Sequence, residues 1–589
     1  MNIVGKLQSV LSEIVLELGI ENKKTIHLAP QGTLSASAIH LEHPNDISHG
    51  DFSTNIAMTL SKELGKNPRE IADIIVEKLS AKKLTEIAEN GVSVAGPGFI
   101  NIKLSSEFFE NSLKNILEFG MEYGNLNIWT GKNILVEHSS PNLFKPFHIG
   151  HMMNNTVGES IARLCYLSGA KTTVISYPSD VSLGIGKAVW QLMEFGVEKL
   201  NELETMPEKM AFLGTCYVGG TNAMKERPEL ETRIREITQD IYEHRDTAAY
   251  EAYKIGRDLN LEYFITMTAR LGSVFDGYIF ESEAGILGKE LVTENTPNIY
   301  IESNEAVIFE PNEADLENDK SLHTRVFINK DGNPTYEAKD TGLLKLKFDR
   351  YNPDLSIFVT DSEQGPYFNV VGTAAGKINP DWQEKTKHMT HGRMQFKGEK
   401  MSSRLGNTPI VSDVLQTVNE AVYDKSGERE MTDERADMIS IAAIKYTILR
   451  TQPGKAINFD PETSLSFEGD SGPYLQYTYA RCQSILRKAT KAGFALNAEK
   501  PESWQTLDLE KYLYRLPSVF ESAFLNYAPQ HVTTYVTELA QLFNSWYGNS
   551  KIIDVDNIET GYKLALVKAT ATVIKKSLWA LGIDAPDEM

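Results

Sequence analysis

Two histidines, His148 and His151, lie three residues apart with Gly150 between them. Imidazole groups can donate hydrogen bonds to oxygens that gain negative charge while a phosphate ester bond breaks. The glycine leaves room for a flat ring or a phosphate to approach the backbone. A bare His-x-x-His pair is also typical of surface histidines or of a metal site. The elements around the pair must therefore decide between these interpretations.

The pair lies where a predicted strand gives way to a predicted helix. Ile134–Val136 is a short β-prone run, and a proline-containing loop separates it from His148. Apolar residues then recur at helical spacing, and Gly169 marks the expected left-handed helix end. The run at 172–177 predicts a second, parallel strand. In such a βαβ unit a ligand binds at the helix N-terminus, whose unpaired N–H groups suit phosphate.

Tyr336 and Asp340 form a second candidate pair after the turn at 331–334. If Tyr336 opens a helix, Asp340 lies one turn along on the same face. A planar guanidinium needs a carboxylate acceptor and can stack on an aromatic ring, so this pair suits it. From the residues alone, an ordinary surface Tyr/Asp pair is an equally good interpretation. A predicted buried strand at 356–361 leads to the polar Gln364.

A third segment, KMSSR at 400–404, places two cations close together. A mobile loop of this kind can close over a triphosphate and neutralise charge on departing pyrophosphate. Alone, such a segment is usually a solvated loop. Shortly before it, Gly392 lies beside a predicted strand, where an adenine can lie against the backbone.

These segments together resemble the class I aminoacyl-tRNA synthetases. HIGH after a strand and KMSSR are similar to the two signatures of that class, and the longer block EHSSPNLFKPFHIGH resembles the arginyl-tRNA synthetase family. GDFSTN, GPGFIN and the C-terminal segment from ETGYKLALVKAT onward resemble the N-terminal and anticodon-binding domains of that family. The chain departs from the family pattern at Ser179, where a glycine is usual, and at Tyr367, where a histidine is usual.

The resemblance implies ATP-dependent attachment of L-arginine to its cognate tRNA through an arginyl-adenylate, with release of AMP and pyrophosphate. It also implies that adenylate formation needs tRNA. Arginine is expected to contact Glu137, Ser140, Asn142, Tyr336, Asp340 and Gln364. ATP is expected to contact His148, Gly150, His151, Gly392, Met394, Lys400, Met401, Ser402 and Ser403. The expected catalytic residues are His148, His151, Lys400 and Arg404. Magnesium is expected to arrive with ATP, without a dedicated protein metal site.

The tRNA is expected to meet both ends of the chain. By the same resemblance, Phe99 and Asn101 would stack on and hydrogen-bond to a loop base at the elbow of the tRNA. Tyr477 and Arg481 lie in a predicted helical bundle that mixes rings with cations, as unstacked anticodon bases require. Core tyrosines with lysines that extend to the surface would give the same pattern, and the first domain alone would pass for an accessory domain without a site.

With 589 residues, the chain is too long for one core. The fold class expected is multidomain α/β. Residues 1–118 would form an accessory α/β domain. Residues 119–460 would form a Rossmann-like parallel-sheet catalytic domain with a helical insertion at about 191–270 and a connecting stem. Residues 461–589 would form an all-α anticodon-binding bundle.

Composition limits the partners and the compartment. The net charge of −21 argues against a nucleic-acid partner unless basic residues gather locally. No apolar run has membrane-spanning length, and the amphipathic N-terminus is not a secretory signal. The three cysteines are far apart, which fits a reducing cytoplasm. We expect a cytoplasmic monomer.

Two other functions stay open at this point. The first is another class I synthetase or an adenylate-forming ligase, which would not depend on Asp340 to activate arginine. The second is a non-catalytic RNA-binding paralogue, against which the intact HIGH and KMSSR segments argue.

Overall fold

The computed structural model describes residues 3–21, 39–44, 46, 49–397, 409–426 and 431–589. The segment KMSSR, with Lys400, Met401, Ser402, Ser403 and Arg404, lies outside these residues. None of the helices in the described part is long and apolar enough to cross a bilayer.

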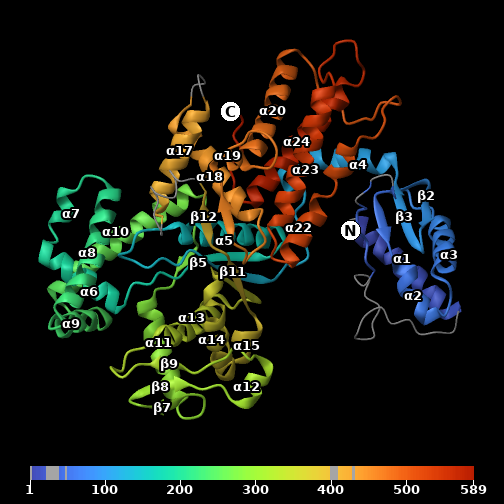
Figure 1. Cartoon of the computed structure of the whole chain (residues 1–589). Helices are drawn as coiled ribbons and strands as arrows, with labels where there is room; N and C mark the ends of the chain where they lie inside the picture. The colour runs from blue at the N-terminus through green and yellow to red at the C-terminus, as the bar shows by residue number, and fades with distance from the viewer. Residues whose placement is uncertain (1–2, 22–38, 45, 47–48, 398–408, 427–430) are drawn as a thin grey trace.

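A five-stranded parallel sheet with the order β11-β10-β4-β5-β6 lies at the centre of the molecule (Figure 1). After β4 the chain forms β5 on one side of β4, and much later it forms β10 on the other side of β4. The strand order therefore reverses between β4 and β10, which opens a crevice at their carboxyl ends. The strands are β4 (Asn133–Glu137), β5 (Lys171–Ser176), β6 (Gly277–Tyr278), β10 (Leu355–Asp361) and β11 (Thr386–His391).

Helix α5 (Ile149–Leu167) follows β4 and confirms the predicted βαβ unit. Gly169 has a φ of +87°, as expected for a left-handed residue after a helix. The apolar face predicted for this helix is buried in the main core. Its members are Val157, Ile161, Leu164 and Cys165.

The N-terminal unit has its own core and a three-stranded antiparallel sheet, β1-β3-β2. Asn67 caps α3 by accepting the backbone N–H of Arg69 at 2.9 Å, with Pro68 in the first turn, where proline is favoured. Tyr514 of the C-terminal bundle packs into this core. The elements are α1 (Ile3–Glu21), β1 (Phe52–Thr54), α2 (Ile56–Leu64), α3 (Pro68–Ala81), β2 (Ile87–Ala95) and β3 (Phe99–Leu104).

A helical insertion with a separate core lies to one side of the sheet (Figure 1). It begins at Leu183, earlier than the sequence indicated. Its elements are α6 (Leu183–Phe195), α7 (Lys199–Glu202), α8 (Met206–Glu226), α9 (Leu230–Tyr242) and α10 (Ala248–Arg270).

The segment between β6 and β11 places α13, with Tyr336 and Asp340, beside the crevice. Helices α11 and α13 cross so closely that a Cβ on Gly288 would lie 1.9 Å from the Ala338 carbonyl oxygen. A Cβ on Gly342 would lie 2.0 Å from the carbonyl oxygen of Ala284. The elements are α11 (Glu281–Glu294), β7 (Ile301–Ser303), β8 (Ala306–Phe309), α12 (Glu313–Asn318), β9 (Arg325–Ile328), α13 (Tyr336–Tyr351), α14 (Gly365–Ile378) and α15 (Pro380–Glu384).

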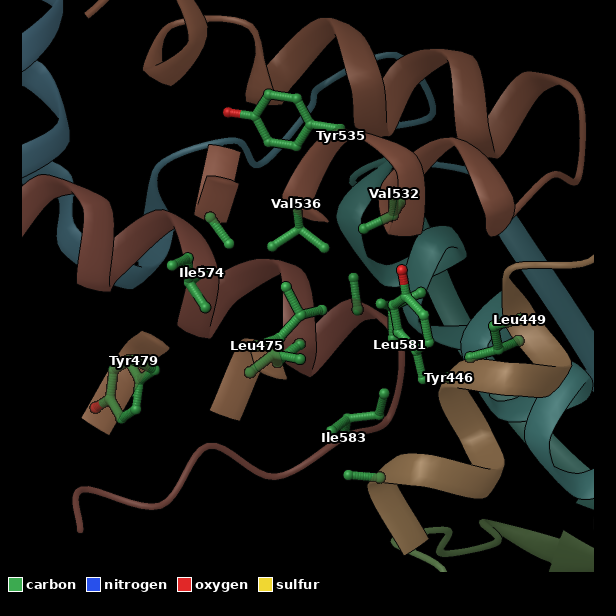
Figure 2. Close-up of a cluster of buried hydrophobic side chains, with 14 of the residues drawn as sticks. Tyr446, Leu449, Leu475, Tyr479, Val532, Tyr535, Val536, Ile574, Leu581 and Ile583 are labelled. Carbon is green, nitrogen blue, oxygen red and sulfur yellow. The ribbon is translucent and has the colours of Figure 1, made fainter. Parts of the chain in front are cut away.

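The C-terminal part is a helical bundle whose core is continuous with that around α5. Figure 2 shows side chains of α18, α20, α23 and α24 meeting in this core. The final helix, α24, is buried on most sides because it packs against α4, α20 and α23. The remaining elements are α4 (Ser106–Phe119), β12 (Met394–Phe396), α17 (Val411–Ser426), α18 (Asp433–Leu449), β13 (Ile457–Phe459), α19 (Pro461–Ser464), α20 (Gly472–Lys491), α21 (Asp508–Leu513), α22 (Leu516–Leu525), α23 (Gln530–Asn549) and α24 (Thr560–Ala580).

The helix crossing gives a stability prediction. Gly288→Ala should lower the thermal unfolding midpoint, because its methyl group collides with backbone and overpacking costs about 1–3 kcal/mol. Gly548→Ala in α23 is the matched control, since nothing lies within 4 Å of its added Cβ; it should keep or raise the midpoint. Equal midpoints for both variants would refute this account of the crossing.

Candidate active site

A cavity of about 860 Å³ lies beyond the carboxyl ends of β4 and β10. It collects residues from segments more than two hundred positions apart in the sequence. Nine of the predicted site residues line it: Glu137, Ser140, Asn142, His148, Gly150, His151, Tyr336, Asp340 and Gln364.

The two histidines form a capping box at the start of α5. The backbone N–H of His148 donates to Nδ1 of His151 at 3.1 Å, and the N–H of Gly150 donates to Nδ1 of His148 at 3.2 Å. Their rings stack with centroids 3.8 Å apart. Because each Nδ1 accepts a hydrogen bond, each neutral ring carries its proton on Nε2. The pair can therefore donate two Nε2–H groups to a ligand.

Both rings are held neutral. Burial lowers the pKa of His148, and the positive charge of Lys145 lowers it further. Burial lowers the pKa of His151 well below its usual value, with further contributions from His148, Lys145 and His391. Neutral imidazoles suit hydrogen-bond donation rather than proton transfer. Gly150 leaves room for the His148 ring, because a Cβ there would lie 3.0 Å from that side chain and would press on it.

Asn154 holds the loop after β4 in place by two hydrogen bonds. It was not among the site residues predicted from the sequence. Its Oδ1 accepts the backbone N–H of Ser139 at 2.7 Å, and its Nδ2 donates to the carbonyl of Val359 in β10 at 2.6 Å. Ser139 has a φ of +57°, so this loop turns sharply. Asn154 lies one turn beyond His151, and this spacing on the helix could have identified it.

The opposite wall of the cavity is acidic. Glu137 forms an ion pair with the buried Lys347, and Glu281 forms one with Lys339 at 2.9 Å. Within the described residues, Asp340 has no ion-pair partner. It accepts a hydrogen bond from the hydroxyl of Tyr367 at 2.5 Å. The wall thus offers one carboxylate without a cation.

Burial raises the pKa of Asp340 to about 8. The hydrogen bond from Tyr367 and the charge of Lys347 oppose this rise, whereas the neighbouring carboxylates of Glu281 and Glu137 add to it. The carboxyl group therefore titrates near neutral pH, and a bound cation would favour its ionised form.

Tyr336 opens α13 as predicted and is 52% exposed. The ammonium group of Lys339 lies 5.2 Å from its ring centroid. Gln364 is exposed at the rim, before α14. The tyrosine ring and the carboxylate of Asp340 line the same cavity.

Two residues predicted near the adenine do not line the cavity. A Cβ on Gly392 would lie 1.9 Å from the carbonyl oxygen of Lys455, so the close approach of the two segments that precede β12 and β13 requires this glycine. Met394 is buried in the main core on β12. Their neighbour His391 lines the cavity instead.

The candidate tRNA contacts lie far from this cavity along the chain. Asn101 is buried, and its Oδ1 accepts from the hydroxyl of Ser53 at 3.0 Å; Phe99 begins β3 and is partly exposed. In the bundle, the guanidinium of Arg481 lies 4.7 Å from the Tyr477 ring centroid. It also lies 5.3 Å from the Tyr547 ring centroid.

The described residues include no cluster of three or more His, Cys, Asp or Glu that could hold a metal ion. The three cysteines, Cys165, Cys216 and Cys482, are free and buried.

Three family descriptions match the chain in order. They are "Arginyl tRNA synthetase N terminal domain" over residues 5–104, "tRNA synthetases class I (R), catalytic domain" over 112–460, and "DALR anticodon binding domain" over 475–589. An arginine–tRNA ligase of Clostridium perfringens is 30% identical over 560 residues, covering 93% of this chain and 96% of that protein. One of Levilactobacillus brevis is 29% identical, covering 95% and 98%.

Two solved structures have the same fold over their full lengths. The arginyl-tRNA synthetase of Thermus thermophilus aligns with a TM-score of 0.75 and 21% identity, covering all of both chains. That of Plasmodium falciparum aligns with a TM-score of 0.75 and 18% identity, with the same coverage.

The capping box gives a second stability prediction. His151→Asn keeps a side-chain oxygen that can accept the N–H of His148, whereas His151→Ala leaves this N–H without its acceptor. The alanine variant should therefore unfold more readily than the asparagine variant by about 1 kcal/mol. Thermal and urea unfolding of the two proteins provide the comparison. If the two variants are equally stable, Nδ1 of His151 does not accept this hydrogen bond. The argument that His151 carries its proton on Nε2 would then fail.

Proposed function

The chain belongs to the arginyl-tRNA synthetase family, and we propose that the 860 Å³ cavity gathers its arginine-binding, ATP-binding and catalytic groups. The enzyme attaches L-arginine to tRNA at the expense of ATP through an arginyl-adenylate. The observation that carries the assignment of the site is the carboxylate of Asp340, which has no ion-pair partner among the described residues and lines the cavity with the half-exposed ring of Tyr336.

The arginine side chain occupies the acidic wall in this proposal. Its guanidinium pairs with Asp340, lies near Glu137 and stacks on Tyr336. Ser140 and Asn142 face the α-amino and carboxylate groups, and Gln364 contacts the substrate from the rim. Lysine, with one ammonium group in place of a planar fork, leaves acceptors unpaired and is rejected without editing.

ATP occupies the helix end of the cavity. Gly150 lets a phosphate or ring approach, and the Nε2–H groups of His148 and His151 point to its charged oxygens. The arginine carboxylate attacks the α-phosphorus, and the bond to pyrophosphate breaks. The imidazoles stabilise charge by hydrogen bonding and exchange no proton.

Because Gly392 and Met394 do not line the cavity, we assign the further ATP contacts to Met401, Ser402 and Ser403. Lys400 and Arg404 neutralise charge on departing pyrophosphate, and Mg²⁺ enters with ATP. A ribose hydroxyl of the terminal tRNA adenosine then attacks the arginyl carbonyl, and AMP leaves.

The tRNA spans the three domains at 1–118, 119–460 and 461–589. Phe99 and Asn101 belong to its elbow contact. Tyr477 and Arg481 belong to the anticodon contact, supported by the stacked arginine and tyrosine rings in the bundle. We place the enzyme in the cytoplasm as a monomer.

Charging tRNA with labelled arginine tests this assignment. Asp340→Asn should raise the KM for arginine roughly 30-fold or more, because it removes one partner of a buried charge pair. Asp349→Asn is the control on the same helix, since its carboxylate is exposed and pairs with Lys345. If Asp340→Asn and the control activate arginine equally well, the guanidinium lies elsewhere; if the wild type charges no amino acid, the catalytic assignment fails.

The raised pKa of Asp340 predicts a pH dependence. Below a pKa of about 8 the carboxyl group is increasingly protonated and cannot pair with a guanidinium. Arginine affinity should therefore rise from pH 6 to pH 8 and then level off, with protons released on binding at pH 7. Calorimetry in two buffers of different ionisation enthalpy measures both effects. Tyr367→Phe removes a hydrogen bond that lowers the pKa of Asp340. In this variant the rise in arginine affinity should therefore occur at higher pH. An unchanged pH dependence of affinity would contradict the role given to Tyr367.

A further inference from the structure

Six carboxyl groups from the part of the chain that the structure describes line the 860 Å³ cavity, and five of them pair with cations of the protein itself. The pairs are Glu137 with Lys347, Glu281 with Lys339, Glu337 with Arg325, and both Asp361 and Glu363 with Arg393. Arg325, on β9, is the only arginine among the described residues of the cavity lining. A guanidinium of the protein therefore already lies in a cavity to which we assign a guanidinium substrate.

Arg325 is held in a fixed orientation by three neighbours. Its Nη1 donates to Oε1 of Glu337 at 2.7 Å, and its Nε donates to Nε2 of His323 at 3.1 Å. The guanidinium carbon lies 5.0 Å from the ring centroid of Tyr367, which is a cation–π distance. Because two hydrogen bonds fix the plane of the guanidinium group, it forms a firm support over one face of this ring.

The ring of Tyr367 connects Arg325 to the acceptor of the cavity. Phe368 packs edge to face against this ring, with centroids 4.7 Å apart. The Tyr367 hydroxyl donates to Oδ2 of Asp340 at 2.5 Å. Glu337 and Asp340 lie three positions apart on α13, so both ends of this chain of contacts return to the same helix. The place of the Tyr367 ring thus decides the direction from which its hydroxyl meets the carboxylate.

We propose that Arg325 is a positioning residue for arginine binding, which holds the Tyr367 ring so that its hydroxyl fixes the plane of the Asp340 carboxylate before the substrate enters. A planar guanidinium forms its strongest hydrogen bonds with a carboxylate that lies in its own plane. Arg325 itself does not contact the substrate in this proposal. The inference rests on the proposed function, because it requires the guanidinium of the substrate at Asp340.

The charge of Arg325, taken alone, predicts the opposite effect on binding. A cation in the cavity wall repels a cationic substrate, and Arg325 also occupies Glu337, which would otherwise attract one. If Arg325 acted only by its charge, its removal would lower the KM for arginine. If it acts by holding Tyr367, its removal raises this KM. The direction of the change therefore distinguishes the two roles.

The test is the KM for arginine in tRNA charging by the full-length enzyme, with ATP and tRNA at saturating concentrations. Arg325→Gln should raise this KM roughly fivefold, which is within the range of coupling measured between contacting residues. The kcat and the KM for ATP should not change, because none of the contacts of Arg325 is with a group assigned to ATP. A general loss of structure would lower kcat as well.

A double-mutant cycle shows whether Arg325 acts through the Tyr367 hydroxyl. Tyr367→Phe keeps the ring and removes the group that reaches Asp340, and should itself raise the KM for arginine. In this background, Arg325→Gln should have little further effect, because the ring no longer acts on the carboxylate. Effects of two independent residues would instead multiply.

Arg350→Gln is the matched control for loss of one positive charge from an ion pair. Arg350 is an exposed arginine in the last turn of α13, pairs with Glu283 and does not line the cavity. This variant should have the KM of the wild type.

Arg325→Lys serves if the glutamine variant does not fold. An ammonium group can keep the ion pair with Glu337, but it lacks the planar fork that pairs with this carboxylate and stacks on the ring together. The lysine variant should therefore fold and still raise the KM for arginine.

The proposal is overturned if the KM for arginine falls or stays unchanged in the Arg325 variants. It is also overturned if the effects of Arg325→Gln and Tyr367→Phe multiply in full, because Arg325 would then act without the hydroxyl. Asp340→Asn separates this inference from the proposed function. If Asp340→Asn raises the KM and the Arg325 variants do not, only the inference fails; if Asp340→Asn leaves the KM unchanged, the assigned arginine site fails.

Discussion

The reversal of strand order between β4 and β10 is the constraint on which the site depends. The connections that follow these two neighbouring strands run in opposite directions. They leave a crevice at the carboxyl ends of the strands, in which a ligand can bind. β4 delivers Glu137 and the start of α5 to one side of the crevice, and β10 delivers Thr360 and Asp361 to the other. Asn154 then ties the two strands by hydrogen bonds to Ser139 and Val359.

The far end of α5 is fixed by the C-terminal bundle. The hydroxyl of Ser160 donates to the carbonyl of Ala580 at 2.9 Å, and Arg163 donates to that of Trp579 at 2.7 Å. The buried Lys445 of α18 donates to the carbonyl of Gly582 at 2.6 Å. These donors add hydrogen bonds to carbonyls at the end of α24, where the N–H partners of the helix run out. The helix that presents the two histidines is thus rigidly joined to the bundle by a continuous core and by charged hydrogen bonds.

Charge in the acidic wall is distributed unequally. Lysines that are themselves buried neutralise Glu137 and Glu281, which offsets the cost of placing carboxylates away from water. Among the described residues, Asp340 has no ion-pair partner and accepts a hydrogen bond from the Tyr367 hydroxyl, so burial disfavours its ionised form until a cation binds. This arrangement holds the wall together in the absence of a ligand and leaves one acceptor for a positively charged group.

The sequence by itself determined the local features, because they depend on neighbours along the chain. The strand before His148, the helix after it and the placement of Tyr336 and Asp340 on one turn follow from periodicity and turn residues. Resemblance in motifs also indicated the reaction. Tertiary structure alone decided which charges meet, since Glu137 and Lys347 are 210 positions apart and no local pattern pairs them. It also assigned Gly392 to a backbone contact and buried α24 on most sides, because long-range packing decides which neighbours surround a residue.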